Sequence, residues 1–379
     1  MSGVALYTAA TIARLPWPDT PDGRYARDYL LPLIEHGPHH AIDNVRTTLG
    51  VLLLDGRTVL PISINSREYG TSYVSSLHTH YVSYAKEELR VVEPRALRTA
   101  LSLVLDGVGL MWRACQMNRV VQVNNWLLST NLYPELTTGQ VRQVTEFLRK
   151  TLPGHAIVFC SLNRNTEPVL TDECAKLGYD LVPSRQIYLA RPAEMTPPRN
   201  IRKDRALLAR SGYEQVPATD LTAPDLERIV ELYRALYRDK YSHYNPMFNI
   251  RFVTEAHRSG TLELIALRKD GRIDGAIGYF SRKGVMTPPI LGYDTSLPQS
   301  TGLYRMLTVM LFDIARANTW VRHASAGAGG FKRARGATPA LEYRAVHTRH
   351  LPHHRRLAWT LLRLLLTRIA VPLTQRLDS

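Results

Sequence analysis

Residues 191–200 contain three prolines, close to the middle of the chain. Proline fixes φ and has no amide donor, so neither a helix nor a central strand continues through this segment. A chain of 379 residues is also long for a single hydrophobic core. We therefore expect four parts: an N-terminal domain at 1–190, a proline-rich linker at 191–200, a second domain at 201–349 and a basic C-terminal helix at 350–379.

The composition is that of an ordinary globular protein, with 45% hydrophobic and 21% charged residues. The three cysteines, Cys115, Cys160 and Cys174, have no CxxC spacing and cannot form a disulfide framework, so a reducing, cytoplasmic compartment is expected. The N-terminus has no pattern of a signal peptide. The apolar tract at 357–373 is interrupted by Arg363 and Arg368, so it is not expected to span a bilayer, and membrane contact is not expected.

The positive charge is placed unevenly along the chain. Up to Asn200 there are 20 lysines and arginines against 18 aspartates and glutamates, and from Ile201 there are 28 against 15. This excess indicates an anionic partner for the second half, such as a tRNA, an acidic carrier protein, a phosphorylated cofactor or a membrane surface. DNA is not among the expected partners. The alternative is a generally arginine-rich composition without a binding role.

The second half has a clear order of predicted elements: strand, two helices, three antiparallel strands, then helix, strand, helix and strand. The first helix begins with Pro224 and Asp225, and the second ends at Gly260. Residues 269–271 (Lys-Asp-Gly) indicate a hairpin turn. The later predicted elements are strands at 262–267, 273–281 and 286–293, a helix at 303–318, a strand at 320–324, a basic helix from Phe331 and a strand at 341–347.

The first half repeats this order less clearly, with predicted strands at 47–54, 58–64, 74–84, 120–128 and 156–162, helices at 94–113, 138–151 and 170–177, and closing strands at 179–189. Two halves with one element order indicate a structural duplication. The expected fold class is α/β, of the α+β mixed-sheet kind. Each half would be a mixed, mostly antiparallel sheet with helices on both faces.

This element order resembles the GNAT acyltransferase fold, present twice. Residues 174–184 resemble the helix-to-strand ending of such domains. Phe331-Lys332-Arg333 with Gly336 resembles the aromatic-Lys-Arg…Gly signature of the Fem-like and cellulose-biosynthesis-type GNAT branch, which often has two tandem halves. The resemblance implies an N-acyltransferase that forms an amide and has no tightly bound cofactor.

The donor is inferred from a departure in the loop that binds the pyrophosphate of acyl-CoA in this family. The expected donor-binding residues are Gln299, Ser300, Thr301, Gly302, Arg305 and Arg333. Tyr304 stands where the family pattern has a small residue, and its side chain should crowd a pyrophosphate. We therefore expect a donor on the phosphopantetheine of a carrier protein or CoA, with aminoacyl-tRNA as an alternative. The first half lacks such a loop and is expected to shape the acceptor pocket.

Amide formation requires a neutral amine, donors for the oxyanion and a proton for the leaving group. The family resemblance places the oxyanion donor near Tyr293. Asp294 is either the base or the cap of a turn, and Lys332 either stabilises the oxyanion or phosphate or is a solvated base. His243 could be a general base, or simply exposed.

The expected substrate-binding residues are Tyr244, Asn245, Tyr73, His78, His80 and Ser325. On a strand, His78 and His80 would share one face, either as an acceptor-site wall or as partly buried histidines. No metal site is expected, because neither a cysteine nor a carboxylate completes a ligand set.

The expected function is acyl transfer from a pantetheine thioester to the amine of a small molecule, in natural-product biosynthesis, without a covalent enzyme intermediate. One alternative is a Fem-like transferase that uses aminoacyl-tRNA, and another is a non-catalytic GNAT-fold binding protein. The C-terminal helix is expected to pack back across the two domains, with a membrane-surface or partner-docking helix as the alternative.

Overall fold

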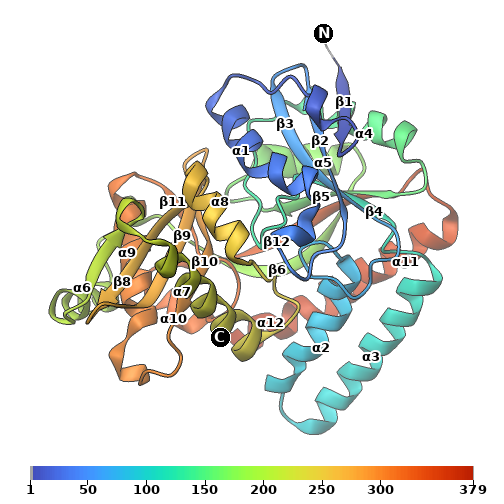
Figure 1. Cartoon of the computed structure of the whole chain (residues 1–379). Coiled ribbons are helices and arrows are strands. Elements are labelled where there is room, and N and C mark those ends of the chain that lie inside the picture. The colour runs from blue at the N-terminus through green and yellow to red at the C-terminus, as the bar shows by residue number, and fades with distance from the viewer. Residues whose placement is uncertain (1–2, 379) are drawn as a thin grey trace. The chain divides into compact units, whose positions relative to one another are not determined.

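The computed structural model describes residues 3–378 and consists of two compact units, both drawn in Figure 1. Unit 1 comprises the residues up to Ser184, Tyr244–Met247 and Glu342–Arg376. Unit 2 comprises Arg185–His243, Phe248–Leu341 and the C-terminal residues from Leu377. The units therefore do not coincide with the two halves of the sequence.

The sheet of unit 1 has the strand order β1-β2-β3-β4-β5-β12. Its first four strands are antiparallel neighbours, β4 and β5 are parallel, and β12 is antiparallel to β5. The strands are β1 (Val4–Thr8), β2 (Thr48–Leu54), β3 (Thr58–Asn65), β4 (Val120–Val123), β5 (Ala156–Leu162) and β12 (Thr338–His347).

The sheet of unit 2 has the order β7-β8-β9-β10-β11-β6 and repeats the pattern of unit 1. Four antiparallel strands are followed by the parallel pair β10 and β11, and β6 is antiparallel to β11. The strands are β7 (Glu214–Pro217), β8 (Glu263–Lys269), β9 (Arg272–Arg282), β10 (Val285–Tyr293), β11 (Val321–His323) and β6 (Asp180–Ala190). The expected mixed sheet and its duplication are confirmed.

The predicted domain boundaries need a correction. The last strand of unit 1 is β12, which comes from the end of the second half, and the last strand of unit 2 is β6, which comes from the end of the first. The chain passes from one unit to the other inside these strands, at Ser184 and again at Leu341. The prolines near 191–200 do interrupt regular structure, but they lie within unit 2 and do not separate the units.

The helices after the first strand, between the two parallel strands and before the last strand recur in both units, whereas α2 (Tyr84–Glu88) and α3 (Arg95–Ala114), between β3 and β4, have no counterpart between β9 and β10. The helices of unit 1 are α1 (Pro21–Glu35), α2, α3, α4 (Thr138–Thr151), α5 (Pro168–Lys176), α11 (His353–Leu365) and most of α12 (Val371–Asp378). Those of unit 2 are α6 (Arg199–Arg210), α7 (Ala223–Arg234), α8 (Ile250–Ser259), α9 (Leu303–Ala317) and α10 (Gly329–Arg333). Thus α4 and α9 each connect the two parallel strands of their unit.

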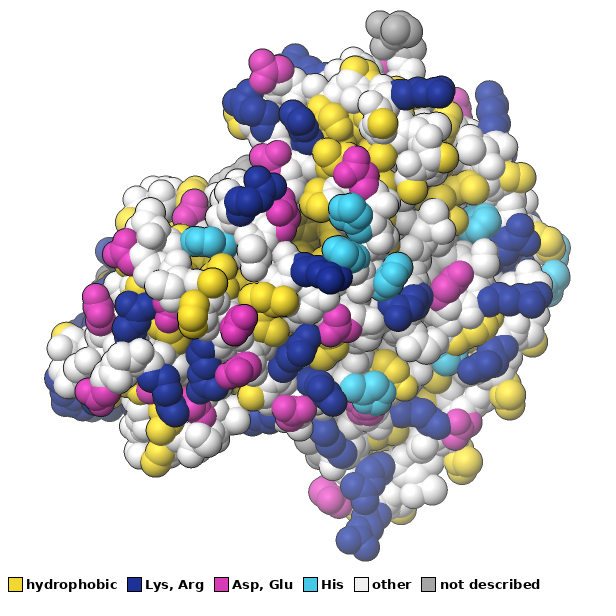
Figure 2. All heavy atoms as spheres, viewed as in Figure 1, with side chains coloured by type: hydrophobic (Ala, Val, Ile, Leu, Met, Phe, Trp, Pro, Cys, Tyr) yellow, Lys and Arg dark blue, Asp and Glu magenta, His cyan; other side chains and the backbone are white. Residues whose placement is uncertain are grey.

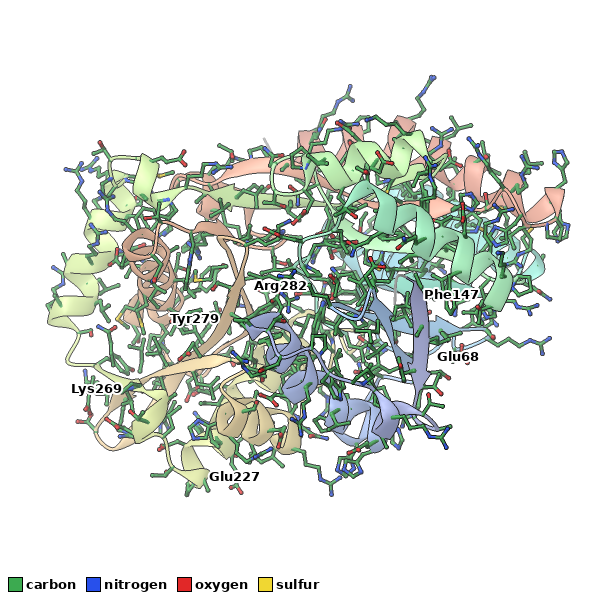
Figure 3. All side chains as sticks on the ribbon, turned by 90° about the horizontal axis from the view of Figure 1, so that it is seen from above. Glu68, Phe147, Glu227, Lys269, Tyr279 and Arg282 are labelled. Atoms are coloured by element: carbon green, nitrogen blue, oxygen red, sulfur yellow. The ribbon has the colours of Figure 1, made fainter. Side chains whose placement is uncertain are left out.

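Local signals explain several boundaries. Helix α8 begins after Asn249, whose side chain accepts from the amides of the first turn, and ends at Gly260 with φ +68°. The hairpin between β8 and β9 turns at Asp270 and Gly271, both with positive φ. Figure 3 labels Lys269 and Tyr279 on these two strands.

The predicted strand at 74–84 is wrong. Residues 79–83 form a π-helical turn that leads into α2. Leu77 and Tyr81 are four residues apart, and both are buried in one cluster with Trp112 of α3. That spacing is the period of a helix, and it outweighs the short alternation of His78 and His80.

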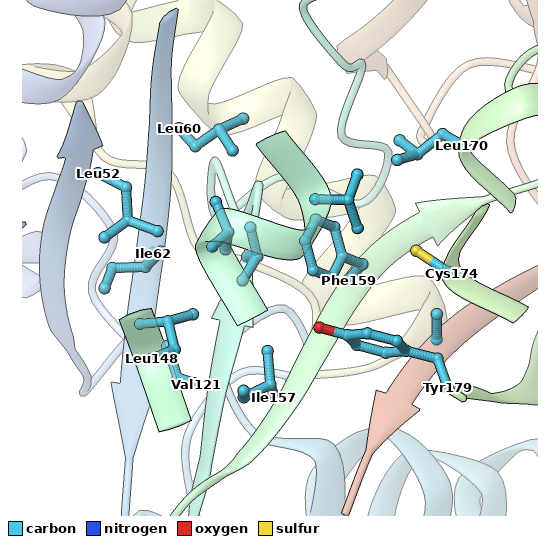
Figure 4. Close-up of a cluster of buried hydrophobic side chains, with 14 of the residues drawn as sticks. Leu52, Leu60, Ile62, Val121, Leu148, Ile157, Phe159, Leu170, Cys174 and Tyr179 are labelled. Atoms are coloured by element: carbon cyan, nitrogen blue, oxygen red, sulfur yellow. The ribbon is translucent and has the colours of Figure 1, made fainter. Parts of the chain in front are cut away.

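The core of unit 1 lies between its sheet and helices α4 and α5 (Figure 4). Leu52, Ile62 and Val121 come from adjacent strands, while Leu148 comes from α4 and Cys174 from α5. In unit 2, helix α9 supplies the corresponding face, with Met306, Leu307 and Met310 packed over β9 and β10. Burial of these apolar faces fixes α9 against the sheet.

The C-terminal helix packs within unit 1 through its first turns. Trp359 of α11 is fully buried and lies 5.5 Å from the ring of Trp112. The helical stretch His353–Arg376 is long and apolar enough to cross a membrane by length and composition, and 17% of its apolar window is buried. The predicted absence of membrane contact stays a prediction.

Candidate active site

The strands β10 and β11 separate soon after they meet. They are paired only at Val285 with Val321 and at Met286 with Arg322, whereas β10 continues to Tyr293. The register of β10 also shifts between Thr287 and Ile290, where the sequence has two consecutive prolines. Proline donates no ladder hydrogen bond, so this bulge follows from the sequence. Beyond Met286, the edge of β10 that faces β11 pairs with no strand among residues 3–378.

Backbone N–H groups point into this open edge. The amide of Asp294 donates to the carbonyl of Asp274 at 2.8 Å. Asp274 lies just before the residues of β9 that pair with β10. Because successive N–H groups of a strand point to opposite edges, those of Leu291 and Tyr293 face the opening. This places two potential oxyanion donors where the family resemblance predicted them.

Helix α9 begins beside this opening with an uncapped N-terminus. Residues Gln299–Thr301 form a 3-10 turn, and Gly302 has φ 75° with no side-chain cap bond to the helix. The first N–H groups of an α-helix have no acceptor within the helix, and the helix dipole makes this end favourable for an anion. The positive φ of Gly302 favours glycine there, and a Cβ would also lie 2.5 Å from the terminal Cδ2 of Leu207, whose side chain would have to shift.

The corresponding helix of unit 1 differs on this point. Thr137 caps α4 by accepting from the amide of Gln140, whose side chain accepts from the amide of Thr137. The parallel pair β4 and β5 also stays in register over all four residues of β4. Unit 1 therefore lacks both the open edge and the uncapped helix end, as expected for a half without a donor site.

A row of aromatic rings extends from the end of β10 to α10. The ring centroids of Tyr293 and Tyr304 are 6.0 Å apart, and those of Tyr304 and Phe331 are 4.7 Å apart. Burial raises the pKa of Tyr304, so its hydroxyl is protonated at neutral pH. Nζ of Lys240 lies 3.4 Å from the hydroxyl of Tyr293. The Tyr304 ring thus packs between two other rings at the start of α9.

Lys332 lies at the far end of this row, only 8% exposed. Its Nζ donates to the carbonyl oxygens of Ala326 at 2.7 Å and Ser325 at 3.3 Å, and lies 5.4 Å from the ring of Tyr188. Burial, followed by the charges of Arg322 and Arg185, lowers the pKa of Lys332 to about 7. An amine that titrates near neutrality can exchange protons with substrate.

The titration of Lys332 predicts a pH dependence of stability. In the unfolded chain a lysine pKa is near 10.4, so between about pH 7 and 10 the unfolded state binds more protons than the folded one. The free energy of unfolding should therefore rise with pH from 7 to 9, and it should rise less in Lys332→Met. Urea unfolding at several pH values measures this, and equal slopes in the two proteins would contradict it.

The structure favours the turn-cap alternative for Asp294 over the proposed base. Its carboxylate accepts from Arg228 at 2.7 Å, from Arg272 at 2.8 Å and from the amide of Ser296 at 2.9 Å. Burial opposes ionisation, but the hydrogen bonds from Ser296 and the two arginines outweigh it and lower the pKa of Asp294. A carboxylate held in this way is a poor acceptor for the proton of an amine.

The expected acceptor residues fall into different surroundings. The carbonyl of Tyr244 accepts from the amide of Tyr73 at 3.0 Å, and that of Asn245 accepts from Asn44 at 2.7 Å, so these two residues belong to unit 1. His243 is exposed and belongs to unit 2. The sequence motif 241–245 is therefore divided between the units.

His78 and His80 do not share the face of a strand. His78 is buried against Tyr69 and Trp112, and burial, followed by the charge of Arg113, lowers its pKa to about 4. His80 is half-buried, with Nε2 3.1 Å from the hydroxyl of Ser184. His78 is a neutral core histidine, which the alternation in sequence could not reveal.

The remaining predicted residues lie near Lys332 or on α9. The hydroxyl of Ser325 accepts from Arg185 at 3.2 Å, and its carbonyl accepts from Lys332. Arg305 donates to Asp204 at 2.7 Å, so it is tied to α6. Arg333 is half-buried on α10. In unit 2, Lys332 thus contacts Ser325, while Tyr293 contacts Tyr304 on the helix that follows loop 299–302.

The sequence predicted no site role for three buried residues of this region, Asp204, Arg335 and Arg322. Asp204 of α6 is fully buried and accepts from Nε of Arg305 and Nε of Arg335, each at 2.7 Å. The signal was present, because Asp204 lies on the same helix face as Ile201 and Leu208, at the spacing of core positions. Arg322 is the third, and it pairs with Met286 at the point where β10 and β11 separate.

Comparisons with known proteins decide the family. Residues 198–335 match the model of the acetyltransferase (GNAT) domain. Residues 198–335 therefore form an acetyltransferase (GNAT) domain. The matched range contains α6, the open edge of β10, the start of α9 and Lys332. The expected N-acyltransferase is therefore confirmed at the level of this family. No match was found among curated proteins.

Several solved structures are similar at low identity. A tandem GNAT protein from the clavulanic acid biosynthesis pathway is 11% identical, with 92% of this chain and 99% of that chain covered and a TM-score of 0.42. FemX is 8% identical over 59% of this chain and 78% of that chain, with a TM-score of 0.45. L-PGS from Bacillus licheniformis is 15% identical over 58% and 77%, with a TM-score of 0.42. These TM-scores are below 0.5, and the family assignment rests on the domain match.

The distribution of charge between the units differs from that between the sequence halves. Unit 2 has 24 lysines and arginines against 15 acidic residues, and unit 1 has 24 against 18. Part of the basic excess of the second half belongs to the segment after Glu342, which folds into unit 1. On the face in Figure 2, basic and acidic side chains are interspersed.

Gly292 of β10 gives a stability prediction for the site. A Cβ at this position would lie 2.6 Å from the amide nitrogen of Tyr233, on the helix that covers β10. Gly292→Ala should therefore push α7 off the strand and lower the free energy of unfolding by about 1–3 kcal/mol. Gly107→Ala is the control, because nothing lies within 4 Å of its Cβ in the middle of α3. Equal stability of Gly292→Ala and wild type in urea unfolding would contradict the close packing.

Proposed function

We propose that unit 2 transfers an acyl group from a pantetheine thioester, on CoA or on a carrier protein, to the amine of a small molecule. The observation that carries the proposal is the open edge of β10 beside the uncapped N-terminus of α9. The edge offers backbone donors for a carbonyl, and the helix end offers donors for a phosphate. Both features are needed for a donor with a thioester at one end and phosphates at the other.

The chemistry follows from these groups. The thioester carbonyl accepts from the amide of either Leu291 or Tyr293, which lie two residues apart on β10, and the free amine attacks its carbon. The new C–N bond forms and the C–S bond breaks. The proton lost by the amine is matched by the proton gained by the leaving thiolate, so that one amide and one thiol are produced. Lys332, with a pKa of about 7, is suited to hold and return this proton.

Two other groups are assigned in this proposal. The amides of the first turn of α9, with Gln299 and Ser300 before them, bind the phosphate end of the donor. Tyr304, packed between Tyr293 and Phe331, lines the path of the pantetheine arm. Unit 1, with its capped α4, binds no donor. We further propose a biosynthetic role for the amide product.

The experiment uses the full chain with three donors and a panel of amines. Acetyl-CoA, an acylated carrier protein and an aminoacyl-tRNA are each incubated with the amines, and amide is detected by mass spectrometry together with free thiol. The proposal expects amide and thiol in equal amounts from a pantetheine donor. Amide formation from tRNA alone, abolished by nuclease, would replace this donor by aminoacyl-tRNA. No consumption of any donor would favour a non-catalytic binding protein.

A further inference from the structure

Arg322 is a buried cation without a partner. Its side chain is only 8% exposed, and its Nε atom is fully buried with no hydrogen bond. Within residues 3–378, no hydrogen bond or ion pair is made by its guanidinium. Burial lowers the pKa of Arg322 to about 10, so the group is still charged at neutral pH. A buried charge without a partner is unfavourable, and a folded protein retains one only for a reason.

Two other buried arginines, Arg344 and Arg355, also have an unbonded Nε, but the fold provides acceptors for their Nη atoms. Arg344 is also 8% exposed, but its Nη1 donates to Gln122 at 2.8 Å and contacts Cys160 at 3.4 Å. Arg355 donates to the carbonyl oxygens of Gly154, Gln116 and Arg119. Arg322 differs from these two because its charge meets no acceptor.

The surroundings of Arg322 make its positive charge still less favourable in the absence of an anion. The positive charge of Arg335, which follows α10, acts on Arg322, and Arg322 itself acts on Lys332. Arg335 is neutralised by Asp204, whose other oxygen is taken by Arg305. Neither Arg322 nor Lys332 has an ion pair with a carboxylate in the described part of the chain. Two cations thus lie close together without an acid.

The position of Arg322 relates it to the active site. It pairs with Met286 at the last point where β10 and β11 are joined, and the strands separate beyond it. Tyr304, whose neutral hydroxyl lies within electrostatic reach of Arg322, belongs to the aromatic row beside the open edge. An arginine fork that donates two parallel hydrogen bonds fits a planar carboxylate or a phosphate.

We propose that Arg322, together with Lys332, binds an oxyanion carried by a substrate of the acyl transfer. The role of this oxyanion in acyl transfer rests on the proposed function. The binding of an oxyanion by Arg322 does not depend on it. The oxyanion has three possible sources: a carboxylate on the acyl group, a carboxylate on the amine acceptor, or a phosphate of the donor. Each of these groups supplies the hydrogen-bond acceptors that Arg322 lacks in the fold. The probes below distinguish the three sources.

Binding is measured by calorimetry on the full-length protein, without turnover. The donor probes are butyryl-CoA and succinyl-CoA, which differ in a terminal carboxylate, and the acceptor probes are glycine and glycinamide. Arg322→Met is compared with wild type, and Arg258→Met, which removes an exposed arginine of the same unit, is the control. Inorganic phosphate alone is the fifth probe.

The expected result is a loss of at least tenfold in affinity of Arg322→Met for one class of probe, with Arg258→Met unchanged. Loss for succinyl-CoA alone assigns the acyl group, and loss for glycine alone assigns the acceptor. Equal loss for both CoA esters and for phosphate assigns a donor phosphate. Wild-type affinity of Arg322→Met for every probe would overturn the proposal, whether or not any acyl transfer is observed.

Thermal stability provides a second, independent readout. Without ligand, Arg322→Met should melt at or above the wild-type temperature, because it removes a buried charge that no partner stabilises. Arg344→Met, which deprives Gln122 of a donor, should melt below it. If Arg322→Met were as unstable as Arg344→Met, Arg322 would be a structural residue and the proposal would fail.

Discussion

Replacing Asp204 by alanine should lower the free energy of unfolding by about 3–5 kcal/mol, because it leaves buried positive charge without its acid. Asp204 is fully buried and joins Arg305 of α9 to Arg335, whose side chain is 9% exposed. Removing one partner of a buried ion pair costs more than the pair contributes. The loss would come in the region that already holds Arg322 and Lys332, so these cations would add to the cost.

The neighbouring pair on the same two helices provides a matched control. Arg205 of α6 donates through Nε to both carboxylate oxygens of Asp313 on α9, each at 3.0 Å, but about a third or more of each side chain is exposed. Asp313→Ala should cost less than about 1 kcal/mol. Urea unfolding of both variants measures the difference. Equal losses would show that the burial of Asp204 does not determine its contribution.

Lys332→Met should lower kcat/KM for amide formation by about 10²–10⁴-fold, the range typical of a group that transfers a proton in the transition state. Methionine keeps most of the volume of the side chain and removes the charge, so packing against Tyr188 should persist. Because the pKa of Lys332 is about 7, the rate of the wild type should change across neutral pH, and this change should be absent in the variant.

The hydrogen bonds from Lys332 to Ser325 and Ala326 could also hold the loop before α10, and Lys332→Arg separates the two roles. Arginine can keep bonds to carbonyl oxygens but does not give up its proton near neutrality. A proton-transfer role predicts that Lys332→Arg remains slow with a normal melting temperature. Full activity of Lys332→Arg would instead assign Lys332 to the support of the loop.

Local signals predicted the elements of unit 2 because several independent signals agree there. Gly260 ends α8, Asp270 and Gly271 turn the hairpin, and α9 begins after the single glycine at 302. Each is a position at which few residue types can adopt the backbone that the fold requires. The predicted ends lie within a few residues of the observed ones.

The exchange of last strands was beyond the reach of these signals. Strands β6 and β12 have the composition of ordinary buried strands, and nothing in a strand sequence specifies its neighbour in the sheet. The prolines after Ala190 suggested a domain boundary, but the unit changes six residues earlier, inside β6. Pairing is a long-range property, and only the registers with β5 and β11 reveal it.

The site was predicted in part, and the errors have a common cause. Lys332 and loop 299–302 were predicted through a family motif, and both lie in unit 2, where we propose the site. Asp294 was chosen for its place after a strand, but the two arginines that hold it come from other elements. Arg322 was missed because burial without a partner is invisible until its neighbours are known. The type of a residue indicates which roles it can have in a reaction. Its contacts in the fold decide which of these roles it can perform.

We propose that the donor binds in unit 2, between the open edge of β10 and the start of α9. Hydrogen exchange of the backbone amides, with and without a saturating pantetheine thioester or a thioether analogue, tests this directly. We expect the amides of residues 291–293 and 303–305 to gain protection from exchange on binding. The amides of residues 138–142, at the start of α4, should gain none. Protection at α4 instead, or at neither helix, would contradict this proposal.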